Sequence, residues 1–120
     1  MLPNASTYDE LVRKFRWDIP EAFNIAHFAC ERWAQKDPDR VAILNRRDDG
    51  KVEKVTYGRL SERSNRFANA LKAAGVKRGD RVALLLPQCP ETAIAHLAVY
   101  KLGAIAVPLA MLFGIDALEY

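Results

Sequence analysis

The chain has 120 residues, of which 50% are hydrophobic and 28% charged, a balance typical of globular proteins rather than fibrous or disordered ones. Its 18 basic and 15 acidic side chains alternate along the sequence without a block of one sign. A nucleic-acid-binding protein gathers its basic residues on one stripe, so we predict no nucleic-acid partner. A compact fold of this size would expose about 6,500 Å² and bury roughly two thirds of the surface of the unfolded chain. The length is short for a complete multi-step enzyme, which needs two domains around a cleft.

The cysteine pattern and the apolar runs bear on the compartment. Cys30 and Cys89 form no Cys-x-x-Cys pair, so neither zinc binding nor thioredoxin-like chemistry is predicted, and a reduced setting is expected. Residues 1–8 lack the basic segment and apolar run of a secretory signal. The longest uncharged stretch, residues 102–115, is too short to cross a bilayer and contains glycine and proline. We therefore expect a cytoplasmic chain without a membrane span.

Residues 1–39 predict two helices with an irregular stretch between them. The first, over residues 7–15, has a polar cap at Ser6 or Thr7, acidic residues in its first turn and basic residues near its end, an order that suits the helix dipole. The second helix follows Asn24 and ends at residues 37–39. Its spacing predicts one apolar stripe, formed by Ile25, Phe28, Ala29 and Trp33.

Residues 40–57 predict a β-hairpin, and a long helix follows it. The strands are expected over residues 41–45 and 51–57, with the turn at Asp48-Asp49-Gly50. The helix over residues 57–74 ends at Gly75, which supplies a left-handed stop. Its apolar face is expected to comprise Leu60, Ser64, Phe67, Ala68 and Leu71.

The remainder of the segment 57–120 predicts a strand, a helix and a second strand. Residues 82–86 and 104–109 are apolar without alternation, which is typical of strands covered on both faces. Between them a helix begins at Pro90 with Cys89 as its cap and is almost wholly apolar, so it should be buried. The fold class is therefore α/β, with helices and a β-hairpin followed by a parallel βαβ unit. Because residues 115–120 begin another helix without a cap, we expect the beginning of a larger α/β domain.

The usual nucleotide-binding and metal-binding motifs are absent from the sequence. Its six glycines form neither a Gly-x-Gly-x-x-Gly pattern nor a P-loop. Cys89 begins a helix, where a thiol becomes more acidic, but it has no basic partner nearby, which favours a cap of apolar character over a reactive thiol. Neither His27 nor His96 has a second ligand three or four residues away, so neither is predicted to bind a metal.

Three further groups of polar residues have both a functional and a structural interpretation. Arg78-Gly79-Asp80 matches a cell-adhesion tripeptide, but its place between a helix and a strand favours a tight turn. Ser61 and Ser64 have no supporting His and Asp pattern. Arg59, Arg63 and Arg66 are three or four residues apart and could form a basic edge that binds a nucleotide or coenzyme A. Glu62 lies among them and can pair with Arg66, which favours a solvated helix face instead. No catalytic, cofactor-binding or metal-binding residue is predicted in this chain.

A series of longer blocks also runs along the chain. They include Phe23-Asn24-Ile25-Ala26, Arg32-Trp33-Ala34, residues 37–43, Val55-Thr56-Tyr57 with Leu60, and residues 65–71, 75–82, 86–91 and 102–109. In order and spacing these blocks resemble the opening of AMP-forming acyl-CoA synthetases, the adenylate-forming acid–CoA ligases. Gln88 departs from the asparagine usual in that family. The first two blocks resemble the branch that activates acetate to medium-chain or aromatic acids, which would place the enzyme in fatty acid metabolism.

This resemblance implies a two-step reaction. A carboxylate attacks the α-phosphate of ATP with Mg²⁺ to give an acyl-adenylate, and coenzyme A then displaces AMP. The family places its phosphate loop, adenine contacts, hinge and catalytic lysine downstream of the matched region, so no residue of this chain inherits those roles. We therefore expect residues 1–120 to be the N-terminal part of the large AMP-binding domain, inactive alone and without tight binding of ATP, Mg²⁺ or coenzyme A.

Two expectations concern partners. As the opening of a ligase, the chain would have the rest of that ligase as its partner, and the whole enzyme would act on a small carboxylic acid. An unfinished sheet should expose apolar area and an open strand edge, which favours self-association. The alternative is a non-catalytic α/β interaction or binding module, for which closed helix caps and a covered sheet would be expected.

Overall fold

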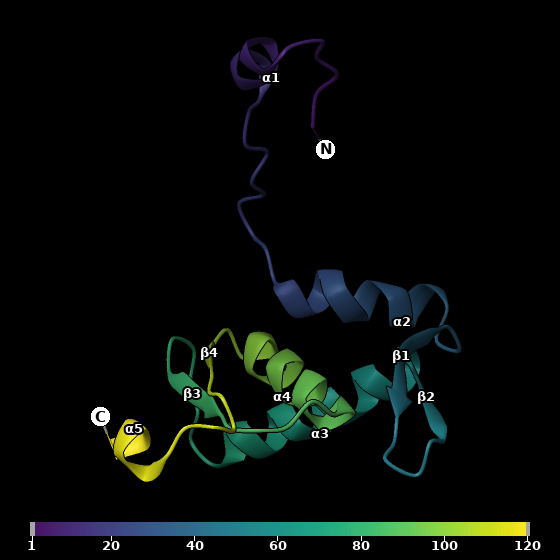
Figure 1. Ribbon diagram of the computed structural model, residues 1–120, viewed down its shortest axis with the longest axis vertical. Coiled ribbons are helices and arrows are strands. Elements are labelled where there is room, and N and C mark those ends of the chain that lie inside the picture. The colour runs from purple at the N-terminus through teal and green to yellow at the C-terminus, as the bar shows by residue number, and fades with distance from the viewer. Residues whose placement is uncertain (1, 120) are drawn as a thin grey trace.

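A computed structural model describes residues 2–119 and confirms the predicted fold class (Figure 1). A helix, α1 (Tyr8–Lys14), comes first and stands apart from the body. The body begins with a π-helical turn, η1 (His27–Glu31), that continues as α2 (Arg32–Lys36). The remaining elements are β1 (Val41–Arg46), β2 (Val52–Thr56), α3 (Tyr57–Ala73), β3 (Arg81–Leu84), α4 (Pro90–Lys101), β4 (Ile105–Pro108) and α5 (Ile115–Glu119). Within residues 2–119, no helix is long and apolar enough to cross a bilayer.

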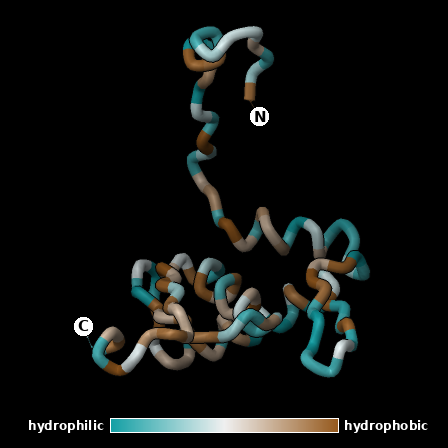
Figure 2. Tube along the Cα trace, in the orientation of Figure 1, coloured by the Kyte–Doolittle hydropathy of each residue, from teal (hydrophilic) through white to brown (hydrophobic). Residues whose placement is uncertain are grey.

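Helix α1 is stabilised by local hydrogen bonds. Thr7, one of the two predicted caps, accepts a hydrogen bond at its Oγ1 from the Glu10 backbone N–H at 3.2 Å, and the Ser6 N–H donates to the Glu10 carboxylate at 2.9 Å. The arrangement resembles a capping box, except that the Glu10 carboxylate binds the N–H of the residue before the cap rather than that of Thr7. An extended segment joins α1 to the body, and Figure 2 shows hydrophobic positions along that segment and along the loop before α5. The described fold exposes 9520 Å², well above the area of about 6,500 Å² expected for a compact chain.

The predicted second helix forms, but the face that it buries is not the predicted one. The side chains that are fully buried are Ala26 and Cys30, whereas Ile25 and Phe28 are 50% and 41% exposed. The prediction of one apolar stripe is therefore wrong for most of its members, and only Trp33 is partly buried. Ala26 and Cys30 are four positions apart, so they share one helix face, and this face packs in a core with Val55 and Leu60. Small side chains at the buried positions allow the turn to lie close against the body.

The β-hairpin forms where the sequence predicts it. Strands β1 and β2 pair antiparallel with Leu44 opposite Lys54, and the turn has Gly50 at φ +80°. The Asp49 carboxylate accepts a hydrogen bond from the Lys51 N–H at 3.0 Å, and this side-chain contact stabilises the turn. Val55 is fully buried on the inner face of the hairpin. It packs in a core that includes Leu60 of α3 and residues of η1 and α4.

Helix α3 begins at Tyr57 and is followed by Gly75, as predicted, and the structure adds its cap. Its N-cap is Thr56, whose Oγ1 accepts from the Arg59 N–H at 3.3 Å, and Gly75 follows it at φ +96°. Three residues of the predicted face are buried or nearly so: Leu60, Ser64 and Ala68. Phe67 is more exposed than expected, at 39%. Helix α4 is buried as predicted, with Ala98 and Val99 fully inaccessible.

Strands β3 and β4 pair in parallel, with Leu84 opposite Pro108. Helix α4 connects them and packs on one face of the pair, where Val99, Leu84 and Ala104 form a buried cluster with residues of α3. The apolar strands are not covered on both faces within the described residues: Ala83 is exposed and Ile105 is 51% exposed, which agrees with the expectation of an unfinished sheet. No second layer of helices lies on that other face within residues 2–119. The predicted last helix begins at Ile115, and Tyr120, the last residue of the segment predicted to begin it, lies outside the described residues.

Candidate functional site

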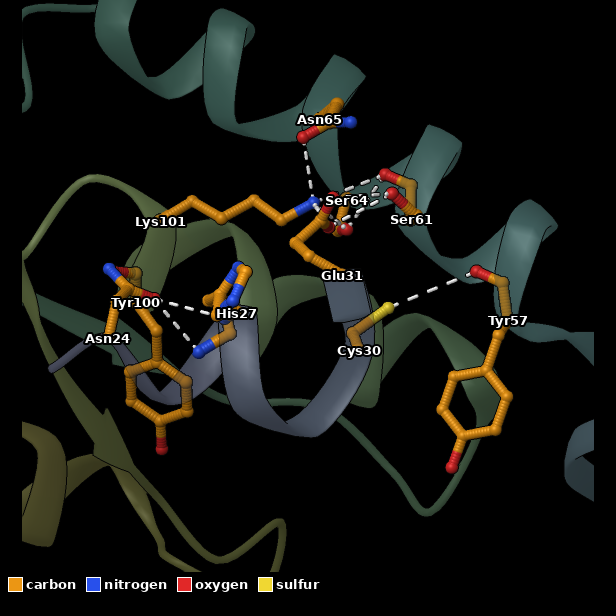
Figure 3. A network of polar contacts seen from close by, with 11 residues as sticks. Asn24, His27, Cys30, Glu31, Tyr57, Ser61, Ser64, Asn65, Tyr100 and Lys101 are labelled. Atoms are coloured by element: carbon orange, nitrogen blue, oxygen red, sulfur yellow. Dashed lines mark hydrogen bonds and ion pairs between the residues drawn. The ribbon is translucent and has the colours of Figure 1, made fainter. Parts of the chain in front are cut away.

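A buried ion pair links the first part of the chain to its last long helix. The Glu31 carboxylate, at the end of η1, lies 2.5 Å from Nζ of Lys101, at the end of α4 (Figure 3). The two side chains are only 24% and 13% exposed. A charge removed from water in this way requires further polar partners, since the ion pair alone rarely repays the cost of desolvation.

Helix α3 supplies those partners. Lys101 Nζ donates to Oδ1 of Asn65 at 2.7 Å, to Oγ of Ser64 at 2.8 Å and to the Ser61 carbonyl at 3.3 Å. The Ser61 hydroxyl donates to the Glu31 carboxylate at 2.9 Å, and the Ser64 hydroxyl donates to the Ser61 carbonyl at 3.0 Å. Within residues 2–119, no buried side-chain nitrogen or oxygen lacks a hydrogen-bond partner. The buried polar groups of the network therefore bind one another, and its geometry is that of a clamp between η1, α3 and α4.

Asn24 fixes the start of the helical segment that carries Glu31. Its Oδ1 accepts from the Ala26 N–H at 2.9 Å, and its Nδ2 donates to the Tyr100 carbonyl at 2.8 Å. The same side chain therefore caps one helix and binds the last turn of another, next to Lys101 (Figure 3). This double contact sets the distance at which Glu31 meets Lys101.

Cys30 lies beside this network in a fully buried position, with its Sγ 3.9 Å from the Tyr57 carbonyl oxygen. The pKa of the Cys30 thiol is raised to about 11, chiefly by burial and also by the neighbouring Glu31 carboxylate, while Lys101 acts in the opposite direction. Because the thiolate is the nucleophilic form, Cys30 is an inert thiol near neutral pH. Both cysteines are free of disulfide bonds.

Cys89, His96 and His27, which were considered from the sequence as candidate site residues, do not bind to this network. Cys89 is the N-cap residue of α4, and its Sγ lies 3.5 Å from Oγ1 of Thr92. His96 contacts the Tyr100 hydroxyl through Nδ1 at 3.2 Å, whereas His27 stacks edge-on against Phe28. Residues 2–119 contain no cluster of three or more His, Cys, Asp and Glu side chains suited to a metal ion. The absence of catalytic, cofactor-binding and metal-binding residues remains a prediction.

The tripeptide Arg78-Gly79-Asp80 forms a tight turn. Gly79 has φ +87°, and the Asp80 carboxylate accepts a hydrogen bond from the Lys77 N–H at 2.8 Å. The Gly79 N–H donates to the Gly103 carbonyl at 3.0 Å, so the turn also holds the end of α4. These bonds account for the glycine and the aspartate by backbone geometry.

Two of the three arginines of α3 have acidic partners. Arg63 pairs with Glu91 of α4 at 2.8 Å, and this guanidinium holds the pKa of the Glu91 carboxyl below its usual value. Arg66 lies 3.9 Å from Glu62, one turn earlier, as the sequence predicts. Arg59 is exposed. These contacts describe a solvated helix face.

Sequence reasoning missed the two charged residues of the clamp, Glu31 and Lys101. The sequence predicts Ser64 on the buried face of its helix and supports neither serine as a nucleophile, whereas in the structure both Ser61 and Ser64 bind these charges. The signal that could have found Lys101 was its position at the end of a helix otherwise almost wholly apolar. A charge on a buried helix requires a partner, and Glu31 is that partner.

Residues 30–120 match the family model described as AMP-binding enzyme. The chain therefore belongs to the AMP-binding enzyme family. An acetyl-coenzyme A synthetase of Magnetococcus marinus is 40% identical over 103 residues, which cover 85% of this chain and 16% of that protein. The acetyl-coenzyme A synthetase of Alkalilimnicola ehrlichii is 44% identical over 97 residues, covering 80% of this chain and 15% of that protein.

A solved structure shares the fold of this chain. The crystal structure of CmiS6 superimposes with a TM-score of 0.72 at 26% identity, covering 88% of this chain and 26% of that chain. The AMP-binding family member described here thus spans only about a sixth of the acetyl-coenzyme A synthetases that it matches, 16% in the case of M. marinus. The matched region, residues 30–120, begins at Cys30, so it contains Glu31, Lys101 and all of α3.

Proposed function

We propose that this chain is part of an ATP-dependent acyl-CoA synthetase, which converts a carboxylic acid to an acyl-adenylate and transfers the acyl group to coenzyme A with release of AMP. The observation that carries the proposal is the 40% identity to an acetyl-coenzyme A synthetase over 85% of the chain. ATP, Mg²⁺ and coenzyme A are the proposed cofactors of the whole enzyme, and a small carboxylic acid is its substrate. A cytoplasmic location is proposed on the two free cysteines.

Residues 2–119 do not by themselves fit ATP or Mg²⁺. The sequence has no glycine-rich phosphate loop, the described part offers no metal-ligating cluster, and the polar groups of the Glu31–Lys101 network already bind one another. We propose that residues 1–120 form the N-terminal part of the large AMP-binding domain: helices in 1–39, the hairpin in 40–57, and helix α3 with the βαβ unit in 57–120. The part is inactive alone, and its partner is the remainder of the ligase chain.

Thioester formation tests this proposal. The purified chain is incubated with ATP, Mg²⁺, coenzyme A and a panel of acids from acetate to medium-chain and aromatic acids, and acyl-CoA and AMP are quantified. We expect no product from the 120-residue chain and both products from a longer product of the same reading frame. Turnover by the short chain would contradict its inactivity. Failure of the longer protein to form an adenylate with every acid would contradict the proposed reaction.

The exposed apolar surface supports self-association of the 120-residue chain. Ile105 on β4 is 51% exposed and Leu112 is 96% exposed, and the paired strands have an uncovered face. We expect light scattering to give an apparent mass above that of the monomer, falling on dilution. Lysine at both positions should lower that mass, because charge blunts open strand edges and apolar patches. A monomer whose mass is unchanged by concentration would contradict this expectation.

A further inference from the structure

Three cationic side chains surround the indole ring of Trp33. The guanidinium carbon of Arg40 lies 4.6 Å from the ring centroid and that of Arg32 lies 5.1 Å from it. Nζ of Lys36 lies 5.8 Å from the same centroid. Within residues 2–119, no ion pair joins any of these three side chains to a carboxylate. We call this group the Trp33 cluster.

The Trp33 cluster differs from Arg63 and Lys101 in that none of its cations forms an ion pair within residues 2–119. Arg63 and Lys101 have carboxylate partners at short distance. Among the nearby acids of the cluster, Glu31 binds Lys101, and Asp37 and Asp39 are exposed residues of the loop before β1 that form no ion pair. The positive charge of the cluster is therefore not neutralised by the described fold.

The side chains of the cluster are held in place before any ligand arrives. Arg32 also lies over the Phe28 ring, 5.2 Å from its centroid, and so contacts two aromatic rings at once. The Trp33 ring lies 6.2 Å from that of Tyr57, and the Tyr57 N–H donates to the Arg40 carbonyl at 2.9 Å. Guanidinium groups restrained on aromatic faces lose less freedom on binding than free ones do.

The geometry limits the size of what could bind. Arg32 and Lys36 are one helical turn apart and share a face of α2, and a hollow of about 290 Å³ lies between them and Trp33. Arg40 enters from the segment that leads into β1. Arg40 does not line that hollow, but all three cations lie within 5.8 Å of one ring centroid, so their charges are close enough together to match a compact ligand with several negative charges.

We propose that Arg32, Lys36 and Arg40 form a binding site for a compact multivalent oxyanion of the phosphate class. The fork of an arginine donates two parallel hydrogen bonds to phosphate oxygens, and the lysine supplies a third charge. This site is independent of the proposed reaction, since no group that it uses belongs to the Glu31–Lys101 network. The indole at its centre provides a direct spectroscopic signal of occupancy.

Fluorescence titration with inorganic pyrophosphate tests the site. Because Trp17 is the other tryptophan and is exposed, a Trp17→Phe background leaves Trp33 as the only indole emitter. At low salt we expect a saturable change in Trp33 emission with one pyrophosphate bound per chain. Arg40→Gln and Arg32→Gln should each weaken binding about tenfold, the value of one charge-assisted hydrogen bond. Added salt should weaken it as well.

Arg47→Gln is the matched control, since Arg47 is an exposed arginine of the hairpin turn with the same charge change. It should leave the affinity unchanged, and circular dichroism should show the same fold in every variant. The proposal is overturned if millimolar pyrophosphate gives no saturable change or if Arg47→Gln weakens binding as much as Arg40→Gln. Tighter binding of a hexaglutamate peptide than of pyrophosphate would also overturn it, because that result indicates an extended acidic partner.

Discussion

Replacing Lys101 with methionine is expected to lower the free energy of unfolding by on the order of 3 kcal/mol. Methionine fills a similar volume, so the loss comes from charge and hydrogen bonding rather than from a cavity. It leaves the Glu31 carboxylate without its cation, and it also removes the donor that binds Ser64 and Asn65. Urea unfolding followed by circular dichroism measures the change. With a total stability of about 5–15 kcal/mol for a natural domain, the shift of the midpoint should be large.

A double-mutant cycle separates the ion pair from other effects of the substitution. Glu31→Gln alone should also destabilise, but the double variant Glu31→Gln/Lys101→Met should lose less than the sum of the two, by about 1 kcal/mol or more. Lys72→Met, on the exposed side of the last turn of α3, is the matched control and should change stability by less than about 0.5 kcal/mol. Equal effects of Lys72→Met and Lys101→Met would show that the network does not stabilise the fold.

Gly58→Ala is expected to destabilise the chain by about 2 kcal/mol, although alanine is the better helix former by about 1 kcal/mol. Gly58 lies in the first turn of α3, where its N–H donates to the Pro38 carbonyl at 2.9 Å. A Cβ at this position would lie 3.0 Å from both the Cβ and the carbonyl oxygen of Pro38. The loop after α2 would have to move away, which weakens its contact with α3.

Gly114→Ala is the control for Gly58→Ala, because a Cβ on Gly114 meets nothing within 4 Å. Thermal unfolding of the two variants should show a fall of the melting temperature for Gly58→Ala and little change for Gly114→Ala. A stabilised Gly58→Ala variant would mean that helix propensity outweighs the close approach of Pro38, and the packing argument would then be wrong.

The features that were predictable from the sequence have short-range causes. The turn at Asp48-Asp49-Gly50 depends on a glycine at positive φ and on an aspartate that bonds two residues on. The stop of α3 at Gly75 and the cap at Thr56 depend on the same kind of local backbone geometry. Family membership was also evident from the sequence, because the order and spacing of its blocks are preserved along the chain.

The features that were not predictable depend on residues far apart in the chain. The burial of Cys30 rather than Phe28 follows from how η1 lies against the body, and no local spacing rule contains that information. Which face of the β3–β4 pair is left uncovered likewise cannot be inferred from the apolar strands. An apolar strand indicates that both of its faces need covering, but not which element covers each face.

The sequence by itself determined the elements of this protein, their order, its α/β class and its family, because caps, turns and apolar spacing act within a few residues. Only the tertiary structure decided what the charges do. Glu31 and Lys101 are 70 positions apart in the sequence. Arg40 lies outside α2 but contacts the Trp33 ring of that helix, and Pro38 contacts Gly58 although the whole β1–β2 hairpin separates them in the sequence. Electrostatic and packing energies depend on distance in space, and that distance is fixed only when the chain is folded.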